Sequence, residues 1–301
     1  MPMQSIRRLV PALLLPFALV AAAQGDDIAK VQIKTTRLAD HVYMLVGAGG
    51  NIGLSVGDDA VFMIDDQFAP LVPKIKAAVA ELTPKPLKFV LNTHFHFDHT
   101  GGNDALGRDG AVIIAHDNVL RRLSSDQVMA FIGAKQTASA HAGLPVLTVP
   151  GDITLHLNGD EIHAFHAPMA HTDGDLIVHF RKADVIHMGD TFFNGFYPFI
   201  DFDNGGSAAG VVAAADQVLA LATERTKIIP GHGPLATRAD LLAYREMLAS
   251  VAGRIRALRA EGRSDDQIAA ATPSAAFDAA WGGGFIKPEK FVTMMLGATG
   301  Q

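Results

Sequence analysis

Short runs rich in β-branched and other hydrophobic residues follow residue 30, and turn residues separate them, a pattern typical of β-strands. A polar Gly57-Asp58-Asp59 turn splits the third run from the fourth. We therefore expect the fold to begin with an antiparallel meander. Its four strands are expected at 31–37, 42–46, 52–56 and 60–64.

A different spacing follows, because Leu71, Ile75, Val79 and Leu82 recur at helical intervals and predict a helix over 70–82. Beyond it, strands are expected at 87–92 and 111–115, and a mostly helical stretch to about residue 142. The second half repeats this order. Strands are predicted at 153–157, 161–165, 175–180, 184–188 and 227–230, and helices at 207–222, 237–260, 264–271, 274–280 and 288–296.

Blocks of strands followed by helices, occurring twice, predict an α/β fold in which two sheets pack face to face with helices outside. The helix at 237–260 opens on Thr237-x-x-Asp240, the pattern of a capping box. No repeat, low-complexity stretch or linker interrupts residues 24–301. We expect one domain over that range.

Residues 1–23 have the pattern of a signal peptide. Arg7 and Arg8 precede an apolar run, 9–20, and Ala21-Ala22-Ala23 offers a cleavage site before Gln24. The run is too short to span a bilayer, which takes about 20 residues. We expect a periplasmic or secreted protein with no stable membrane anchor after cleavage.

Composition narrows the chemistry of any site. The 301 residues include thirteen histidines and no cysteine, which excludes disulfides, thiolate metal sites and cysteine nucleophiles. The formal net charge is −6, and loss of Arg7 and Arg8 makes it more negative. An acidic surface is a poor match for a phosphate backbone, so we expect a small-molecule substrate and no nucleic acid.

The strongest motif is Thr93-His94-Phe95-His96-Phe97-Asp98-His99-Thr100-Gly101-Gly102, at the end of an apolar strand. Alternation places His94 and His96 on one face of an extended segment, and Asp98 and His99 turn toward a neighbouring point. Four ligand-type side chains in six residues would be unfavourable in a core unless they hold a cation. The motif therefore predicts a metal site.

This motif resembles the His-x-His-x-Asp-His motif of the metallo-β-lactamase superfamily, and the resemblance covers most of the chain beyond residue 23. The family has three later ligands, and the matching residues are His171, Asp190 and His232, each beside a predicted strand. The resemblance implies a four-layer αβ/βα sandwich with two mixed β-sheets.

Carried over residue by residue, the resemblance implies two metal ions. One would be held by His94, His96 and His171, and the second by Asp98, His99 and His232, with Asp190 bridging them or completing the second site. Three imidazoles suit Zn²⁺ and leave a position open, so we expect zinc, two ions per chain, with iron or manganese as alternatives. A metal-bridging hydroxide would be the nucleophile, and Asp98 could orient it.

Other residues have weaker signals. Asn194 and Tyr197 follow Asp190 in an aromatic loop and could line the substrate pocket, and Asn194 is the candidate for polarising a carbonyl. His166 could support a metal ligand, and His116 could face the mouth of the site. The other histidines are expected to be structural: His41, His141, His156, His163, His179 and His187.

The resemblance implies metal-assisted hydrolysis of a small ester, lactone, thioester or amide, with β-lactams among the candidates. A dedicated β-lactamase is one alternative. Two lactamase subclasses carry cysteine where this chain has Asp190, and the third does not use aspartate there. The segment 191–207 also lacks any Lys or Arg to hold the carboxylate of such a drug. The other alternative is a non-catalytic periplasmic metal-binding accessory protein.

Overall fold

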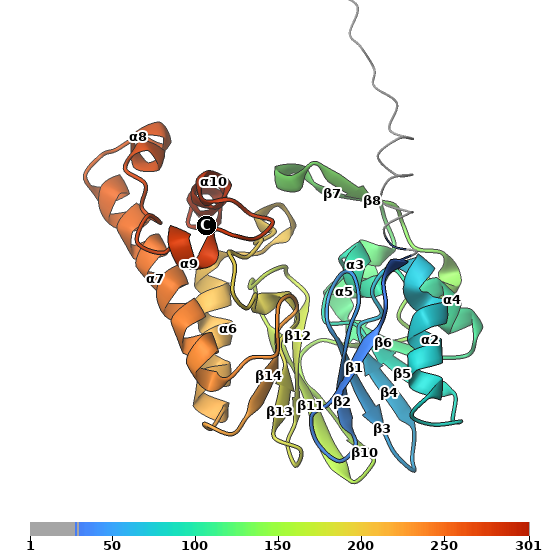
Figure 1. Cartoon of the computed structure of the whole chain (residues 1–301). Coiled ribbons are helices and arrows are strands. Elements are labelled where there is room, and N and C mark those ends of the chain that lie inside the picture. Colours follow the sequence, from blue (N-terminus) through green and yellow to red (C-terminus); the bar gives the residue numbers. More distant parts are fainter. Residues whose placement is uncertain (1–27, 29, 301) are drawn as a thin grey trace, which may run out of the picture.

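The structure is a computed structural model that describes residue 28 and residues 30–300. Two β-sheets lie face to face, and helices cover their outer faces (Figure 1). The α/β sandwich expected from the sequence is therefore confirmed. The predicted signal peptide, 1–23, lies outside the described residues and stays a prediction.

The first sheet has seven strands in the order β1-β2-β3-β4-β5-β6-β9. The first four form the predicted antiparallel meander, and the last three add in parallel. Their bounds are β1 Lys34–Arg37, β2 Val42–Val46, β3 Ile52–Val56, β4 Val61–Ile64, β5 Leu87–Leu91, β6 Val112–His116 and β9 Leu147–Val149.

The second sheet has five strands in the order β10-β11-β12-β13-β14, antiparallel except for the last pair. Their bounds are β10 Ile153–Leu157, β11 Asp160–Ala167, β12 Asp175–Phe180, β13 Val185–His187 and β14 Lys227–Ile229. The central strand β12 is almost wholly buried, as expected for a strand covered on both faces.

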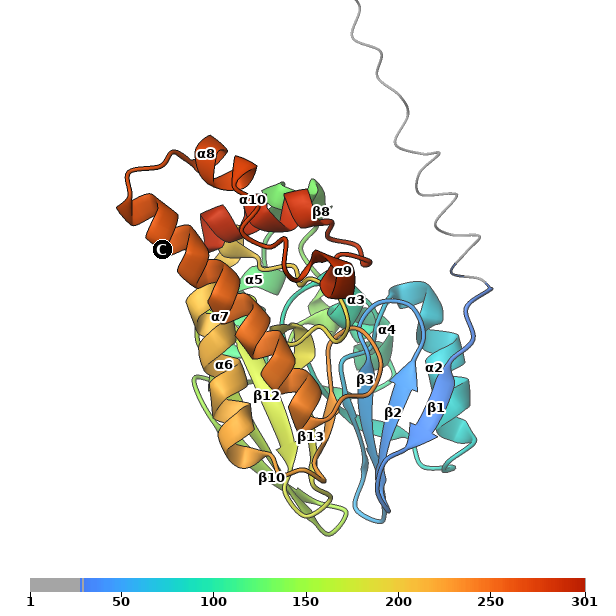
Figure 2. The same ribbon diagram turned by 60° about the vertical axis from the view of Figure 1, so that its left-hand side comes forward.

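Three hydrophobic layers hold the sandwich together. Between the sheets, Phe62 and Ile64 of β4 pack with Val178 and Phe180 of β12, and the rings of Phe62 and Phe180 meet edge to face at 6.5 Å. Outside the first sheet lies α2, Val72–Ala80, and outside the second lie α6, Ala208–Leu221, and α7, Arg238–Ala260 (Figure 2). The capping box predicted at Thr237 and Asp240 opens α7.

Short helices complete the chain. Their bounds are α3 Phe97–Thr100, α4 Asn103–Arg108, α5 Asp117–Leu123, α8 Asp265–Ala270, α9 Asp278–Trp281 and α10 Pro288–Ala298. Among the described residues, no helix is both long enough and apolar enough to cross a membrane.

The prediction of a mostly helical stretch to about residue 142 is wrong beyond α5. A hairpin of β7, Gln127–Met129, and β8, Ala134–Gln136, occupies its middle, and β9 was not predicted at all. Each of these strands has only three residues, too few for a period to be recognised. The chain reverses through Gly133, whose φ of 68° favours glycine. The predicted helix at 274–280 is likewise shorter, because only α9 is helical there.

Candidate metal centre

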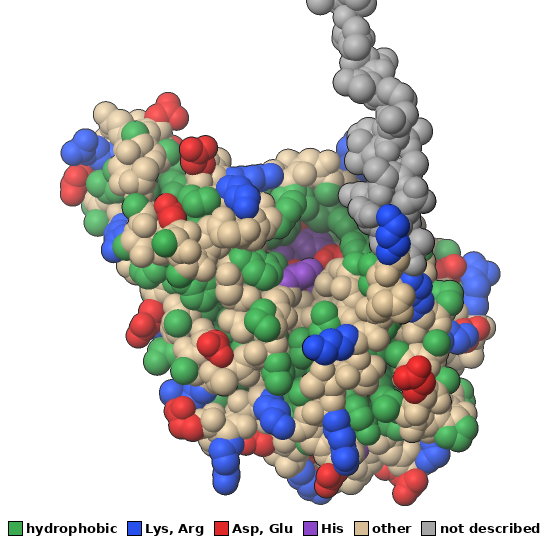
Figure 3. All heavy atoms as spheres, viewed as in Figure 1, with side chains coloured by type: hydrophobic (Ala, Val, Ile, Leu, Met, Phe, Trp, Pro, Cys, Tyr) green, Lys and Arg blue, Asp and Glu red, His purple; other side chains and the backbone are tan. Residues whose placement is uncertain are grey.

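The sequence-predicted ligands come together where the two sheets end at one edge. The segment after β5 carries the four early ligands, and the later three flank strands of the second sheet: His171 precedes β12, Asp190 follows β13 and His232 follows β14. Figure 3 shows a hollow on this face, with histidine and acidic side chains at its floor and hydrophobic side chains around it.

The first cluster consists of His94, His96, His171 and Asp190, all at most 5% exposed. Nδ1 of His96 and Nε2 of His171 lie 2.9 Å apart. One oxygen of Asp190 lies 3.6 Å from Nε2 of His171 and 3.8 Å from Nε2 of His94. Four donor atoms therefore surround one point in the interior.

The second cluster consists of Asp98, His99 and His232. Nε2 of His232 lies 3.3 Å from the Asp98 carboxylate, and Nε2 atoms of His99 and His232 are 3.4 Å apart. Asp190 also reaches this cluster, 3.0 Å from His99 and 3.4 Å from His232. The Asp190 carboxylate therefore has close contacts to ligands of both groups, as expected for a shared ligand.

Hydrogen bonds on the far side of the imidazole rings fix which nitrogen faces inward. His96 donates from Nε2 to Asp201 at 2.8 Å, and His171 donates from Nδ1 to the Phe199 carbonyl at 2.9 Å. With those protons committed outward, Nδ1 of His96 and Nε2 of His171 face each other as two lone pairs. A cation beside them resolves that conflict.

A second set of hydrogen bonds orients the other two histidines of the motif, His94 and His99. Asp65 accepts from Nδ1 of His99 at 2.7 Å and from the Thr93 hydroxyl at 2.8 Å, and that hydroxyl lies 3.0 Å from Nδ1 of His94. Nε2 of His94 is buried without a hydrogen-bond partner. An orphaned imidazole nitrogen in a ring of imidazole and carboxylate donors fits a divalent borderline metal ion.

Asp65 and Asp201 are positioning residues that the sequence did not reveal. Asp65 has a φ of 62°, a strained conformation for a non-glycine residue, and it also accepts from the Thr93 backbone at 2.7 Å. Its place at the end of β4, beside the motif strand, is a signal that could have found it. Asp201 lies in an irregular loop far along the chain, and no motif marks it.

Burial dominates the protonation of the first cluster. Desolvation lowers the pKa of His171 to about 4, although Asp190 opposes the effect. Burial, reinforced by the neighbouring His99, also holds the pKa of His94 well below its ordinary value. Both imidazoles are therefore neutral at pH 7, the form that binds a metal.

Carboxylates dominate the second cluster. Burial alone would lower the pKa of His232, but Asp190 and Asp98 raise it to about 9. The pKa of His99 is raised well above its ordinary value for the same reason, since Asp190, Asp98 and Asp65 outweigh desolvation. Burial alone would raise the pKa of Asp190, but His99 and His232 outweigh burial and hold that pKa well below its ordinary value.

Glycines let the backbone touch the ligands. A Cβ on Gly50 would lie 2.1 Å from Cε1 of His99, and one on Gly231 would lie 2.0 Å from an Asp190 oxygen. Non-bonded heavy atoms do not approach each other so closely, so both positions need glycine.

The weaker candidates lie apart from the ligand atoms. The Asn194 amide donates to the Pro234 carbonyl at 3.0 Å and its backbone donates to His232, so it braces the His232 loop. Its catalytic role stays a prediction. The pocket role for Tyr197 is wrong, because its side chain is buried, its hydroxyl donates to Asp278 at 2.7 Å and its ring stacks on Phe291.

The two uncertain histidines stack on each other. The rings of His116 and His166 lie 3.9 Å apart at 20°. His116 accepts from the Asn118 backbone and so caps α5, while His166 bonds the Asp173 carbonyl. Their positions in the sequence suggested proximity to the site. These contacts give both rings structural partners, and the roles predicted for them at the site stay predictions.

Aromatic rings wall the ligand clusters. Phe193 stacks on His232 with centroids 5.1 Å apart, and Phe199 stacks on His96 at 5.9 Å. Phe97, within the motif, packs on Phe68 at 5.9 Å. The surroundings of the site therefore favour a substrate with an apolar part.

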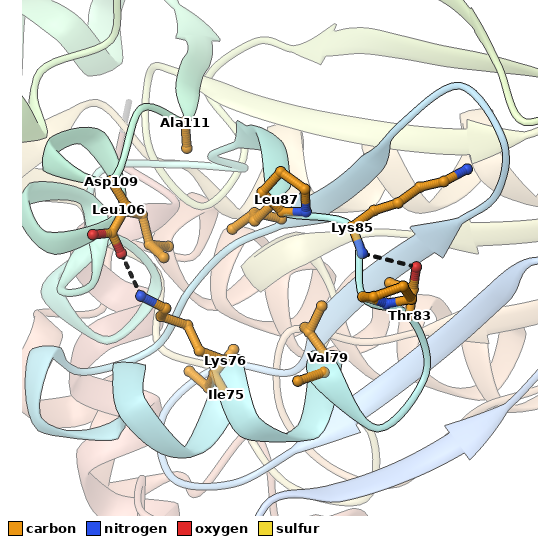
Figure 4. Close-up of a pocket in the computed structure, with 12 residues that line it drawn as sticks. Ile75, Lys76, Val79, Thr83, Lys85, Leu87, Leu106, Asp109 and Ala111 are labelled. Atoms are coloured by element: carbon orange, nitrogen blue, oxygen red, sulfur yellow. Dashed lines mark hydrogen bonds and ion pairs between the residues drawn. The ribbon is translucent and has the colours of Figure 1, made fainter.

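A separate cavity of about 410 Å³ lies on the outer side of the first sheet (Figure 4). Ile75 and Val79 of α2, Leu87 of β5 and Leu106 of α4 line it, and an ion pair of 2.6 Å between Lys76 and Asp109 lies at its edge. It contains none of the seven candidate ligands. The cavity therefore offers no metal chemistry.

Comparisons with known proteins agree with the geometry. Residues 46–232, which span both clusters, match the family described as the metallo-beta-lactamase superfamily. The chain is 27% identical over 188 residues to "Probable metallo-hydrolase YqgX" of Bacillus subtilis, a match that spans 58% of this chain and 85% of that protein. It is 28% identical to the hydroxyacylglutathione hydrolase of Polaromonas sp., over 60% of this chain and 65% of that enzyme.

Among solved structures, a metallo-beta-lactamase from Pontibacter korlensis is similar in fold, with a TM-score of 0.57. The superposition covers 72% of this chain and 99% of that one, at 16% sequence identity. Identity at that level shows a shared fold and nothing about the substrate.

Proposed function

The chain belongs to the metallo-beta-lactamase superfamily, and from this premise we propose that it is a dinuclear metal-dependent hydrolase of small carbonyl substrates. The observation that carries the proposal is the pair of adjacent donor clusters that share Asp190. Esters, lactones, thioesters and amides form the substrate class. The hydroxyacylglutathione hydrolase among the relatives favours thioesters within it.

We propose that His94, His96 and His171 hold one ion and that Asp98, His99 and His232 hold the other, with Asp190 shared between them. Zinc suits both sets, with iron or manganese as alternatives. Such ions polarise a carbonyl group and lower the pKa of water when they are bound. Asp98 and His232 are partly exposed and would meet the substrate, whereas the first cluster is shielded beneath them.

A dedicated β-lactamase is a weaker proposal, because no Lys or Arg occurs in 191–207, the segment that follows Asp190. A non-catalytic accessory protein is also weaker, because every ligand position of the family motif is present. Export to the periplasm or beyond, by way of residues 1–23, remains part of the proposal.

The test is metal analysis combined with a substrate panel of an aryl ester, a lactone, a thioester, nitrocefin and a phosphodiester. We expect two equivalents of metal per chain and turnover of at least one acyl substrate. The control is His156→Ala, which removes an exposed histidine of β10 and should change neither result. Two equivalents of metal without turnover between pH 5 and pH 9 would support the accessory protein instead.

A further inference from the structure

We propose that Lys290 binds an anionic group of the substrate at the outer rim of the hollow above the metal centre. The substrate is then an amphipathic anion, with its reacting carbonyl at the floor, an apolar body along the wall and a negative group at the rim. This proposal rests on the hydrolase function proposed above. Lys290 lies in α10, far from the ligand motif in sequence.

A row of aromatic rings connects the first ligand cluster to Lys290. Phe199 stacks on His96 at 5.9 Å and 26°, and Phe131, in the turn of the β7–β8 hairpin, stacks on Phe199 at 6.3 Å and 13°. The Lys290 ammonium lies 5.3 Å from the centroid of Phe131. Two ring-to-ring steps and one ring-to-ammonium step therefore connect a metal ligand to Lys290, and the apolar body of the substrate would follow this row.

The charge of Lys290 is available to a ligand. Among the described residues, no carboxylate lies within ion-pair distance of it, and its ammonium contacts only the rings of Phe131 and, at 5.8 Å, Phe285. By contrast, Arg122 is paired with Asp173 at 2.7 Å. The two aromatic faces hold the ammonium ion in place by cation–π attraction.

The apolar body of the substrate has a matching surface. Phe285, beside Lys290, is 70% exposed. Such exposure is unusual for a large aromatic side chain and is typical of a binding surface. Figure 3 shows hydrophobic side chains around the mouth of the hollow, and Figure 1, drawn from the same side, places the β7–β8 hairpin above that region. Carboxylates and sulfates share the chemistry that Lys290 would recognise, so the test includes both.

The test compares matched aryl esters that carry a carboxylate, a sulfate or a neutral amide at the far end of the ring. In the metal-loaded protein, Lys290→Met should raise KM for the anionic esters about fivefold, the size of an exposed ion pair, and leave the neutral ester unchanged. Lys290→Arg should restore the original ratio. The preferred anion is the one whose KM changes more.

The matched control is Lys287→Met, which removes the same charge from the start of the same helix. The Lys287 ammonium is bonded to the Gly283 carbonyl at 3.1 Å, so KM should not change. An equal change for anionic and neutral esters in Lys290→Met, or an equal effect of Lys287→Met, would overturn the assignment.

Failure of the hydrolase proposal is distinguishable from failure of this one. If the unmodified protein cleaves none of the esters, calorimetric binding of 4-hydroxybenzoate and of its neutral amide to the metal-loaded protein replaces KM. Weaker binding of the anion alone in Lys290→Met supports the role of Lys290. Equal binding of the anion by both proteins, or no binding to either, overturns it.

Discussion

The two donor clusters lie side by side, yet their electrostatics are opposite. The first is closed to solvent, and burial keeps its histidines His94 and His171 neutral. The second is partly exposed, and carboxylates keep His99 and His232 protonated in the metal-free protein. Before any metal binds, the first cluster presents unprotonated nitrogen lone pairs and the second is a network of ion pairs. Two adjacent metal sites can therefore differ in the protonation state from which each binds its ion.

Asp190 is the residue on which this comparison depends most, because it contacts both clusters. Asp190→Ala should lower the affinity for both metal equivalents and reduce hydrolysis to background. Metal content after dialysis, together with turnover of the best substrate, measures the effect. A variant that keeps two equivalents and its activity would show that Asp190 is not a shared ligand.

Single-cluster variants should separate the two ions. His96→Ala should remove one equivalent and abolish activity, and His232→Ala should remove the other. Titration of each variant with Zn²⁺ by calorimetry distinguishes them, since each should retain one binding step, and the two retained steps should differ in affinity and in proton release. If both variants lose both equivalents, the ions bind as one cooperative unit and the comparison of two separate clusters fails.

The different protonation states of the two clusters predict which metal-binding step releases protons. At pH 7 His99 and His232 must each lose a proton to bind a metal, whereas His94 and His171 are already neutral. Zn²⁺ uptake by the second cluster should therefore release up to two protons and weaken as pH falls below about 9, the raised pKa of His232. A pH indicator in weak buffer measures the release. Equal release in both steps would contradict the assignment.

The raised pKa of His232 also predicts how the stability of the metal-free protein depends on pH. The pKa of His232 is higher in the folded state, at about 9, than the ordinary value of 6.5. Its ion pairs therefore contribute stability fully below pH 6.5, and that contribution is lost as pH rises through 9. The melting temperature of the metal-free protein should fall over that window, whereas His232→Gln should flatten the dependence.

The positioning carboxylates should have the smallest effects. Asp201→Asn replaces the carboxylate that accepts from His96 by a neutral amide, and Asp65→Asn does the same for His99 and, through the Thr93 hydroxyl, for His94. Loss of such a partner typically weakens metal affinity by about 10–100-fold. Competition with a chelator should show Asp201→Asn weakened at one equivalent and Asp65→Asn weakened at both. A uniform loss at both equivalents in Asp201→Asn would mean that Asp201 acts through the fold.

The sequence could predict most of the sandwich and the whole candidate ligand set, for different reasons. Strands such as 42–46 and 175–180 have the expected bounds because they are mostly hydrophobic runs bounded by polar or turn residues. The ligands are recognisable because chemistry restricts their residue types and four of them lie within six residues of a single motif.

What the sequence could not predict depends on contacts between distant segments. Nothing in the sequence distinguishes Asp201 from other loop aspartates, because its role depends on the hydrogen bond it accepts from His96. The buried position of Tyr197 likewise depends on the hydrogen bond from its hydroxyl to Asp278. The β7–β8 hairpin that brings Phe131 over Phe199 consists of two strands too short to have a pattern. Lys290 becomes relevant only once α10 has packed beside that hairpin.

The position of the ligands at the meeting edge of two sheets has a mechanical consequence. His94 and His96 belong to the first sheet, and His171 and His232 belong to the second, so an ion bound by both sets would tie the two halves together. A tie of this kind closes a long loop and restricts the unfolded chain, as a disulfide does in other proteins. In a chain without cysteine, the metal centre would thus serve as a removable cross-link, and chelation would loosen the seam between the sheets before it unfolded either one.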